Sequence, residues 1–110
     1  MKVAYVFSTP LAHKILSAMI VPQLESNRHI VEVVGMFFFV DNTFLLQQGN
    51  DVGERLKAIS KKTGMLLMAC DICAYERKID KSLVDGAKIG CFPDLYLALS
   101  GVGVDQVITL

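Results

Sequence analysis

Short apolar runs alternate with amphipathic or polar segments along the whole chain. The runs are too short and too irregular for a helical period, which favours buried strands. Predicted strands occupy residues 3–7, 30–40, 65–69, 87–90 and 106–110. Predicted helices lie between Pro10 and Pro22, over residues 51–64, over residues 72–79 and over residues 92–99. Strands that alternate with helices predict an α/β domain: an open, mainly parallel five-stranded sheet with helices on both faces.

The predicted ends of the helices rest on individual residues. Pro22 is expected to end the first helix, because a proline has no N–H to donate. Asp51, followed three positions later by Glu54, is expected to cap the second helix, and Gly64 to end it. Residues 43–48 are compatible with either a short helix or an ordered loop.

Size and charge narrow the possible functions. The 110 residues predict one domain, 1–110, and 53% of them are hydrophobic, above the roughly 45–50% of typical soluble domains. The excess favours a fully covered sheet or a subunit interface. Eleven basic residues balance eleven acidic ones, so neither nucleic acid nor an anionic membrane is an expected partner.

The start of the chain and its cysteine content indicate a compartment. The first residues run directly into a strand without the features of a signal peptide, and residues 30–40 are too short to span a bilayer. We therefore expect a cytoplasmic protein, in which the thiols stay reduced. Three cysteines, an odd number, also argue against a disulfide framework.

The predicted topology gathers polar and thiol groups at one edge of the sheet. Right-handed crossovers place the carboxyl ends of parallel strands together, where open α/β sheets usually bind ligands. Residues at those ends are Ser8, Thr9, His13, Asp41, Asn42, Cys70, Cys73 and Cys91. His13 is expected to face solvent, Asp41 and Asn42 to form a turn, and Cys91 to belong to the core. Cys70 is compatible with either structural burial or chemistry.

Cys73 is the candidate reactive thiol. It falls in the first turn of a predicted helix, where free N–H groups and the helix dipole favour a thiolate. Arg77, four residues later, adds positive charge on the same face, whereas Asp71 and Glu76 oppose it. The C-x-x-C spacing also occurs in thioredoxin-like redox motifs and zinc sites. Here the motif follows the third strand rather than the first, and four suitably spaced zinc ligands are lacking, so no metal is expected.

Residues 70–79, Cys-Asp-Ile-Cys-Ala-Tyr-Glu-Arg-Lys-Ile, resemble the C-G-T-C-x-x-A-R-G-I segment of the DsrE/DsrF-like sulfur-relay family, which includes TusD-type proteins. Residues 37–46 are similar to its F-x-x-D-G-x-x-L-L segment, and residues 105–110 to its closing D-x-V-x-x-F strand. The chain departs from the motif at Asp71-Ile72, where the family has Gly-Thr, and at Lys78, where it has glycine.

The resemblance implies a small sulfur carrier that needs no cofactor. Cys73 matches the cysteine that holds sulfur as a persulfide, Arg77 would stabilise its anion, and Cys70 would assist transfer or resolve the persulfide as a disulfide. The implied partners are sulfur donor and acceptor proteins and further copies of the chain in a trimer or hexamer. The alternative is a non-catalytic assembly or regulatory subunit of the same fold with vestigial thiols.

Overall fold

The computed structural model describes all residues from 1 to 110, and its centre is a five-stranded parallel sheet. Every adjacent pair of strands is parallel, and the order across the sheet is β4-β3-β2-β1-β5. The strands are β1 (Lys2–Phe7), β2 (Glu32–Phe38), β3 (Leu66–Cys70), β4 (Lys88–Gly90) and β5 (Gln106–Thr109). The predicted α/β class is therefore confirmed.

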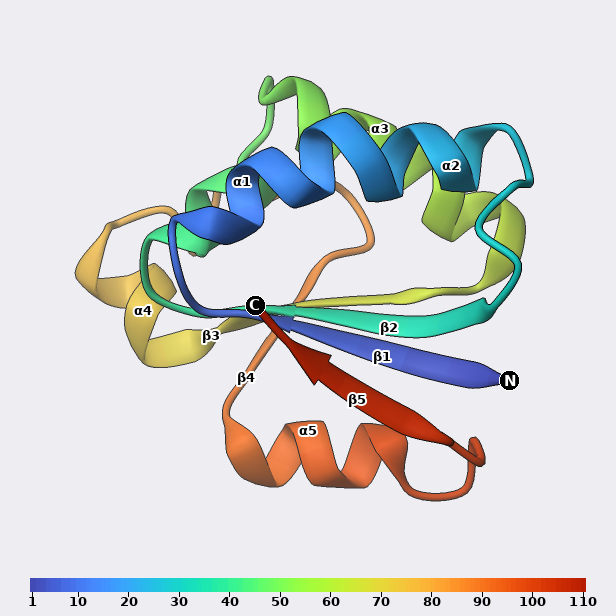
Figure 1. The fold of residues 1–110 in the computed structure, drawn as a ribbon. Helices are drawn as coiled ribbons and strands as arrows, with labels where there is room; N and C mark the ends of the chain where they lie inside the picture. Colours follow the sequence, from blue (N-terminus) through green and yellow to red (C-terminus); the bar gives the residue numbers. More distant parts are fainter.

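The helices lie on both faces of the sheet, but unequally. Figure 1 shows α1, α2 and α3 above the sheet, α5 alone below it, and α4 beyond the carboxyl end of β3. Their bounds are α1 (Leu11–Ile15), the π-helical η1 (Leu16–Ile20), α2 (Val21–Glu25), the 3₁₀-helical η2 (Val40–Leu46), α3 (Asp51–Thr63), α4 (Asp71–Glu76) and α5 (Phe92–Leu99). None of these helices has the length and apolar character needed to cross a membrane.

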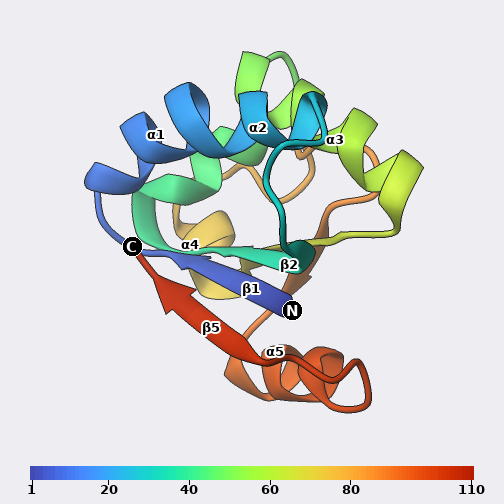
Figure 2. The same ribbon diagram turned by 45° about the vertical axis from the view of Figure 1, so that its right-hand side comes forward.

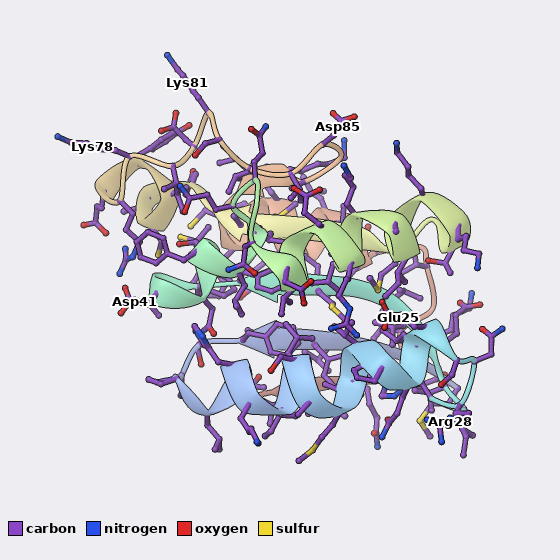
Figure 3. All side chains as sticks on the ribbon, turned by 90° about the horizontal axis from the view of Figure 1, so that it is seen from above. Glu25, Arg28, Asp41, Lys78, Lys81 and Asp85 are labelled. Carbon is purple, nitrogen blue, oxygen red and sulfur yellow. The ribbon has the colours of Figure 1, made fainter.

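The core follows this arrangement. Side chains that point up from the strands join those of α1 to α3 in a cluster of 22 buried residues, which includes Phe7, Phe38 and Leu56. Between the helices, Glu25 of α2 points toward α3 (Figure 3), where its carboxylate accepts a 2.9 Å hydrogen bond from Arg55 Nε. On the lower face, Ala4, Phe37 and Met68 from the strands and Leu95 from α5 form a separate cluster of four buried residues.

The first helical segment corrects the prediction at Pro22. The chain remains helical through Pro22 to Glu25, because a wider π turn precedes the proline. In that turn the N–H of Val21 donates to the carbonyl oxygen of Leu16, five residues back. Proline normally clashes with the carbonyl four residues before it and lacks an N–H, and the π turn is a local adjustment that absorbs such a disruption.

The start of α3 corrects a second prediction. Asn50, not Asp51, is the N-cap, because its side-chain oxygen accepts hydrogen bonds from the N–H groups of Val52 and Gly53. Glu54 instead accepts from the N–H of Gly49 at 2.9 Å. Gly64 ends the helix in a left-handed conformation, φ 79°, as predicted. The segment left open by the sequence belongs largely to η2.

Candidate functional site

The carboxyl ends of β1 to β4 bring the predicted site residues to one edge. Cys70 ends β3 and is the N-cap of α4, and Cys73 lies in the first turn of that helix. Cys91 follows β4 and is the N-cap of α5. Cys70 pairs in register with Gly90 of β4, and Cys91 is the residue that follows Gly90. All three cysteines have free thiols.

Cys73 is half-buried and has a hydrogen-bond donor at its sulfur. The main-chain N–H of Val40, the first residue of η2, donates to Cys73 Sγ at 3.2 Å. This hydrogen bond fixes the position of the sulfur relative to η2. The side chain is therefore neither sealed in the core nor free in solvent, which suits a nucleophile that must meet a partner.

Cys70 has a different environment. Its side chain is only 7% exposed, and burial raises the pKa of its thiol to about 11. The nearby thiols of Cys73 and Cys91 also raise this pKa, and a hydrogen bond from the main-chain N–H of Cys73 opposes them. Cys70 is therefore protonated at neutral pH and is a poor nucleophile there.

Cys91 is held by the start of α5. It forms a capping box with Asp94, whose Oδ2 accepts the Cys91 N–H at 2.8 Å. Gly90 must precede it, because a Cβ there would lie 2.7 Å from the Cβ of Asp94. The side chain of Cys91 is half-buried. This differs from the prediction that Cys91 belongs to the core.

Arg77 contacts the peptide backbone and an acid around Cys73. Its Nε and Nη2 each lie 2.9 Å from Asp41 Oδ1, and its Nη1 donates to the carbonyl oxygen of Cys73 at 3.2 Å. Glu76 Oε1 lies 3.7 Å from Nη1. The guanidinium thus ties α4 to η2.

A small cleft adjoins this cluster. Its volume is about 280 Å³, and it is lined by Ser8, Pro10, His13, Val40, Asp41 and Asn42. Figure 3 shows Asp41 at the end of the molecule where η2 and α4 meet. His13 is exposed, as predicted, whereas Asn42 is buried, donates from Nδ2 to the carbonyl oxygen of Thr9 at 3.2 Å and has no partner for Oδ1.

A larger cavity of about 800 Å³ lies at the opposite, amino end of the strands, where Lys2, Glu32 and Met65 contribute to its lining. No cysteine lines it. No group of three or more His, Cys, Asp or Glu side chains is positioned to hold a metal ion. The three cysteines lie at the carboxyl ends of the strands, on the side of the smaller cleft, whose lining includes Val40 but no cysteine.

Val40 is the site residue that sequence reasoning missed. It was expected only to close an apolar strand, and its side chain carries no chemistry. Its contribution is a main-chain N–H that meets Cys73, 33 residues away in the sequence. No residue pattern signals such a contact.

No family model matches this chain, and no curated protein matches it significantly. Among solved structures, the chain is similar to the crystal structure of the ychN protein from E. coli, with a TM-score of 0.69 and 18% sequence identity. The alignment covers 99% of this chain and 97% of ychN. At this identity the likeness shows a shared fold, and it agrees with the predicted DsrE-like α/β domain.

Proposed function

We propose that this protein carries sulfur as a persulfide on Cys73 and transfers it to the thiol of an acceptor protein. The observation that carries the proposal is a half-buried Cys73 whose sulfur accepts an N–H at the carboxyl edge of a parallel sheet. The motif resemblance in residues 70–79 and the fold shared with ychN support it.

The proposed chemistry is two exchanges at sulfur. The Cys73 thiolate attacks the outer sulfur of a donor persulfide, a new S–S bond forms on Cys73, and the donor leaves as its thiolate. The acceptor thiolate then attacks the outer sulfur on Cys73, the S–S bond to Cys73 breaks, and Cys73 returns as a thiolate. Neither exchange needs an external oxidant or reductant, and neither uses a cofactor.

Cys70 and Arg77 have supporting roles in this proposal. Cys70 would resolve the persulfide only slowly at neutral pH, because its pKa of about 11 keeps it protonated. That slow step would form a Cys70–Cys73 disulfide and release hydrogen sulfide. Arg77 would hold the segments around Cys73 in place through Asp41 and the Cys73 carbonyl. The relay requires reduced thiols, so we place it in the cytoplasm.

The test is loading from a persulfidated cysteine desulfurase, followed by intact mass measurement. The wild-type protein should gain one sulfur atom that a second thiol protein removes. Cys73→Ser should gain none, whereas Cys91→Ser, the matched control, should still be loaded. A wild-type protein that gains no sulfur, or a Cys73→Ser variant that gains as much, would contradict the proposal.

The second candidate is a non-catalytic subunit of a homo-oligomer, a trimer or hexamer. Exposed apolar side chains on α5 and β5, namely Phe92, Tyr96, Leu97 and Val107, favour a surface that contacts another copy. Such a subunit has no need of a reactive thiol. Alkylation of Cys73 no faster than that of a small reference thiol at neutral pH would favour this candidate over the carrier.

A further inference from the structure

Val40 has a backbone conformation that its side chain disfavours. Its φ is 49°, in the left-handed region, where β-branched residues are rare. Its side chain is 44% exposed, so apolar burial offers little compensation. Strained residues of this kind persist only where their surroundings enforce them, and they concentrate at functional sites.

Main-chain and side-chain hydrogen bonds enforce the turn at Val40. The N–H of Phe39 donates to the carbonyl oxygen of Phe7 at 2.9 Å, and the N–H of Asn42 donates to the carbonyl oxygen of Phe39 at 3.1 Å. Thr43 Oγ1 donates to the carbonyl oxygen of Val40 at 2.8 Å. The peptide on each side of Val40 is thereby fixed.

Arg77 connects the segment that carries the hydrogen-bond donor, the Val40 N–H, to the segment that carries the acceptor, Cys73 Sγ. It binds the side chain of Asp41, the residue after Val40, and the carbonyl oxygen of Cys73. One guanidinium thus bonds to the segments of both Val40 and Cys73, and the Arg77 side chain is largely buried. The strained conformation and this link together direct the Val40 N–H to Cys73 Sγ.

We propose that Val40 is a positioning residue for Cys73: its enforced left-handed turn holds a main-chain N–H that stabilises the anionic sulfur of the thiolate and of the persulfide. The inference rests on the proposed role of Cys73 in sulfur transfer. Three other non-glycine residues have positive φ, Asn27, Ile30 and Lys78, and none of their N–H groups donates to a thiol. Hydrogen bonds to ionised sulfur are stronger than those to a neutral thiol, so the contact tightens as charge appears.

The direct test leaves the Val40 backbone unchanged. In a pH titration of the uniformly ¹⁵N-labelled protein, the Val40 amide proton should move downfield with the same midpoint as the alkylation of Cys73. Cys73→Ser should abolish that movement. A Val40 amide that does not follow Cys73 ionisation would overturn the inference, even if Cys73 accepts sulfur; failure of sulfur loading would instead count against the proposed function.

Substitutions supply the second test, read as the Cys73 alkylation rate at neutral pH by peptide mass spectrometry. Val40→Gly keeps the donor and tolerates positive φ, so its rate should stay within about twofold of wild type. Val40→Pro removes the N–H and, because proline cannot adopt the positive φ of Val40, also opens the left-handed turn; the two losses together should slow alkylation about tenfold. Ile30 is another β-branched residue with positive φ (73°), so Ile30→Gly releases similar backbone strain away from Cys73. This control should leave the alkylation rate unchanged. Equal rates in Val40→Pro and Val40→Gly would overturn the inference.

Discussion

The two faces of the sheet differ in how completely helices cover them. The upper face lies under α1, α2 and α3 and contributes to a core of 22 buried residues, whereas the lower face is covered by α5 and has a cluster of four. Figure 2 shows α5 and β5 standing apart from the helices of the upper layer. The comparison indicates that the upper face provides most of the stability, whereas the α5 layer below the sheet leaves apolar side chains such as Tyr96 and Leu97 exposed.

The difference follows from the order of the strands. The chain moves in one direction from β1 through β2 and β3 to β4, and only the last crossover returns to place β5 on the other side of β1. Right-handed crossovers in one direction lie on one face of a sheet, and a crossover in the reverse direction lies on the other. The single returning helix, α5, is therefore the sole helical cover of the lower face.

The strongest test compares one leucine from each face. Leu56→Ala, under the upper layer, should lower the free energy of unfolding by about 4 kcal/mol, because the cavity cannot collapse in a large core. Leu95→Ala, on α5, should cost about 2 kcal/mol, since the neighbouring surface is open to solvent. Urea denaturation measures both values. Equal losses in the two variants would refute the difference between the faces.

A second test uses the pH dependence of stability and concerns Cys70. This residue lies two positions after Met68 in β3, so the side chains of both face the lower side of the sheet. Burial raises the pKa of its folded thiol to about 11 from an ordinary 9.0, so the folded state keeps a proton that the unfolded chain loses first. The associated stabilisation, on the order of 3 kcal/mol, is full below about pH 9 and disappears as the pH rises through about 11. The stability gap between wild type and Cys70→Ala should therefore narrow over that range.

The difference in stability between wild type and Cys70→Ala can be measured by urea unfolding between pH 8 and pH 11, roughly the range over which Cys70 ionises. Cys91→Ala is the control: it retains Cys70 and removes only the smallest cause of the pKa shift, so it should keep most of the wild-type pH dependence. A gap between wild type and Cys70→Ala that stays constant across the range would show that Cys70 ionises alike in the folded and unfolded states.

The smallest effect on folding is expected on the exposed side of α5. Leu97 is 73% exposed, so Leu97→Lys should change the free energy of unfolding of the monomer by less than about 0.5 kcal/mol. If the apolar surface of α5 joins copies of the chain, the same substitution should shift the protein toward monomer in sedimentation velocity. The exposed Ala58→Lys on α3 is the matched control. An unchanged assembly in Leu97→Lys would remove α5 from the interface.

The hydrophobic pattern, together with capping residues, was sufficient to predict the five strands, most of the helical segments and the parallel sheet. Apolar runs such as residues 65–69 are too short for core helices, and their alternation with amphipathic segments favours one fold class. The placement of Cys70 and Cys73 at the end of a strand followed from the same pattern. The predictions from local residue preferences were wrong at Pro22 and Asp51. A π turn lets the helix continue through Pro22, and the neighbouring Asn50 caps α3 in place of Asp51; residue preferences do not distinguish these alternatives.

The sequence thus determined where the thiols lie along the chain and which edge of the sheet they reach. Only the tertiary structure decided the strand order, the unequal cover of the two faces, the burial that keeps Cys70 protonated and the N–H of Val40 at Cys73 Sγ. The physical reason is range. Periodicity and capping act over one or two turns of chain, whereas these features arise between main-chain and side-chain groups that tertiary packing brings together from distant segments.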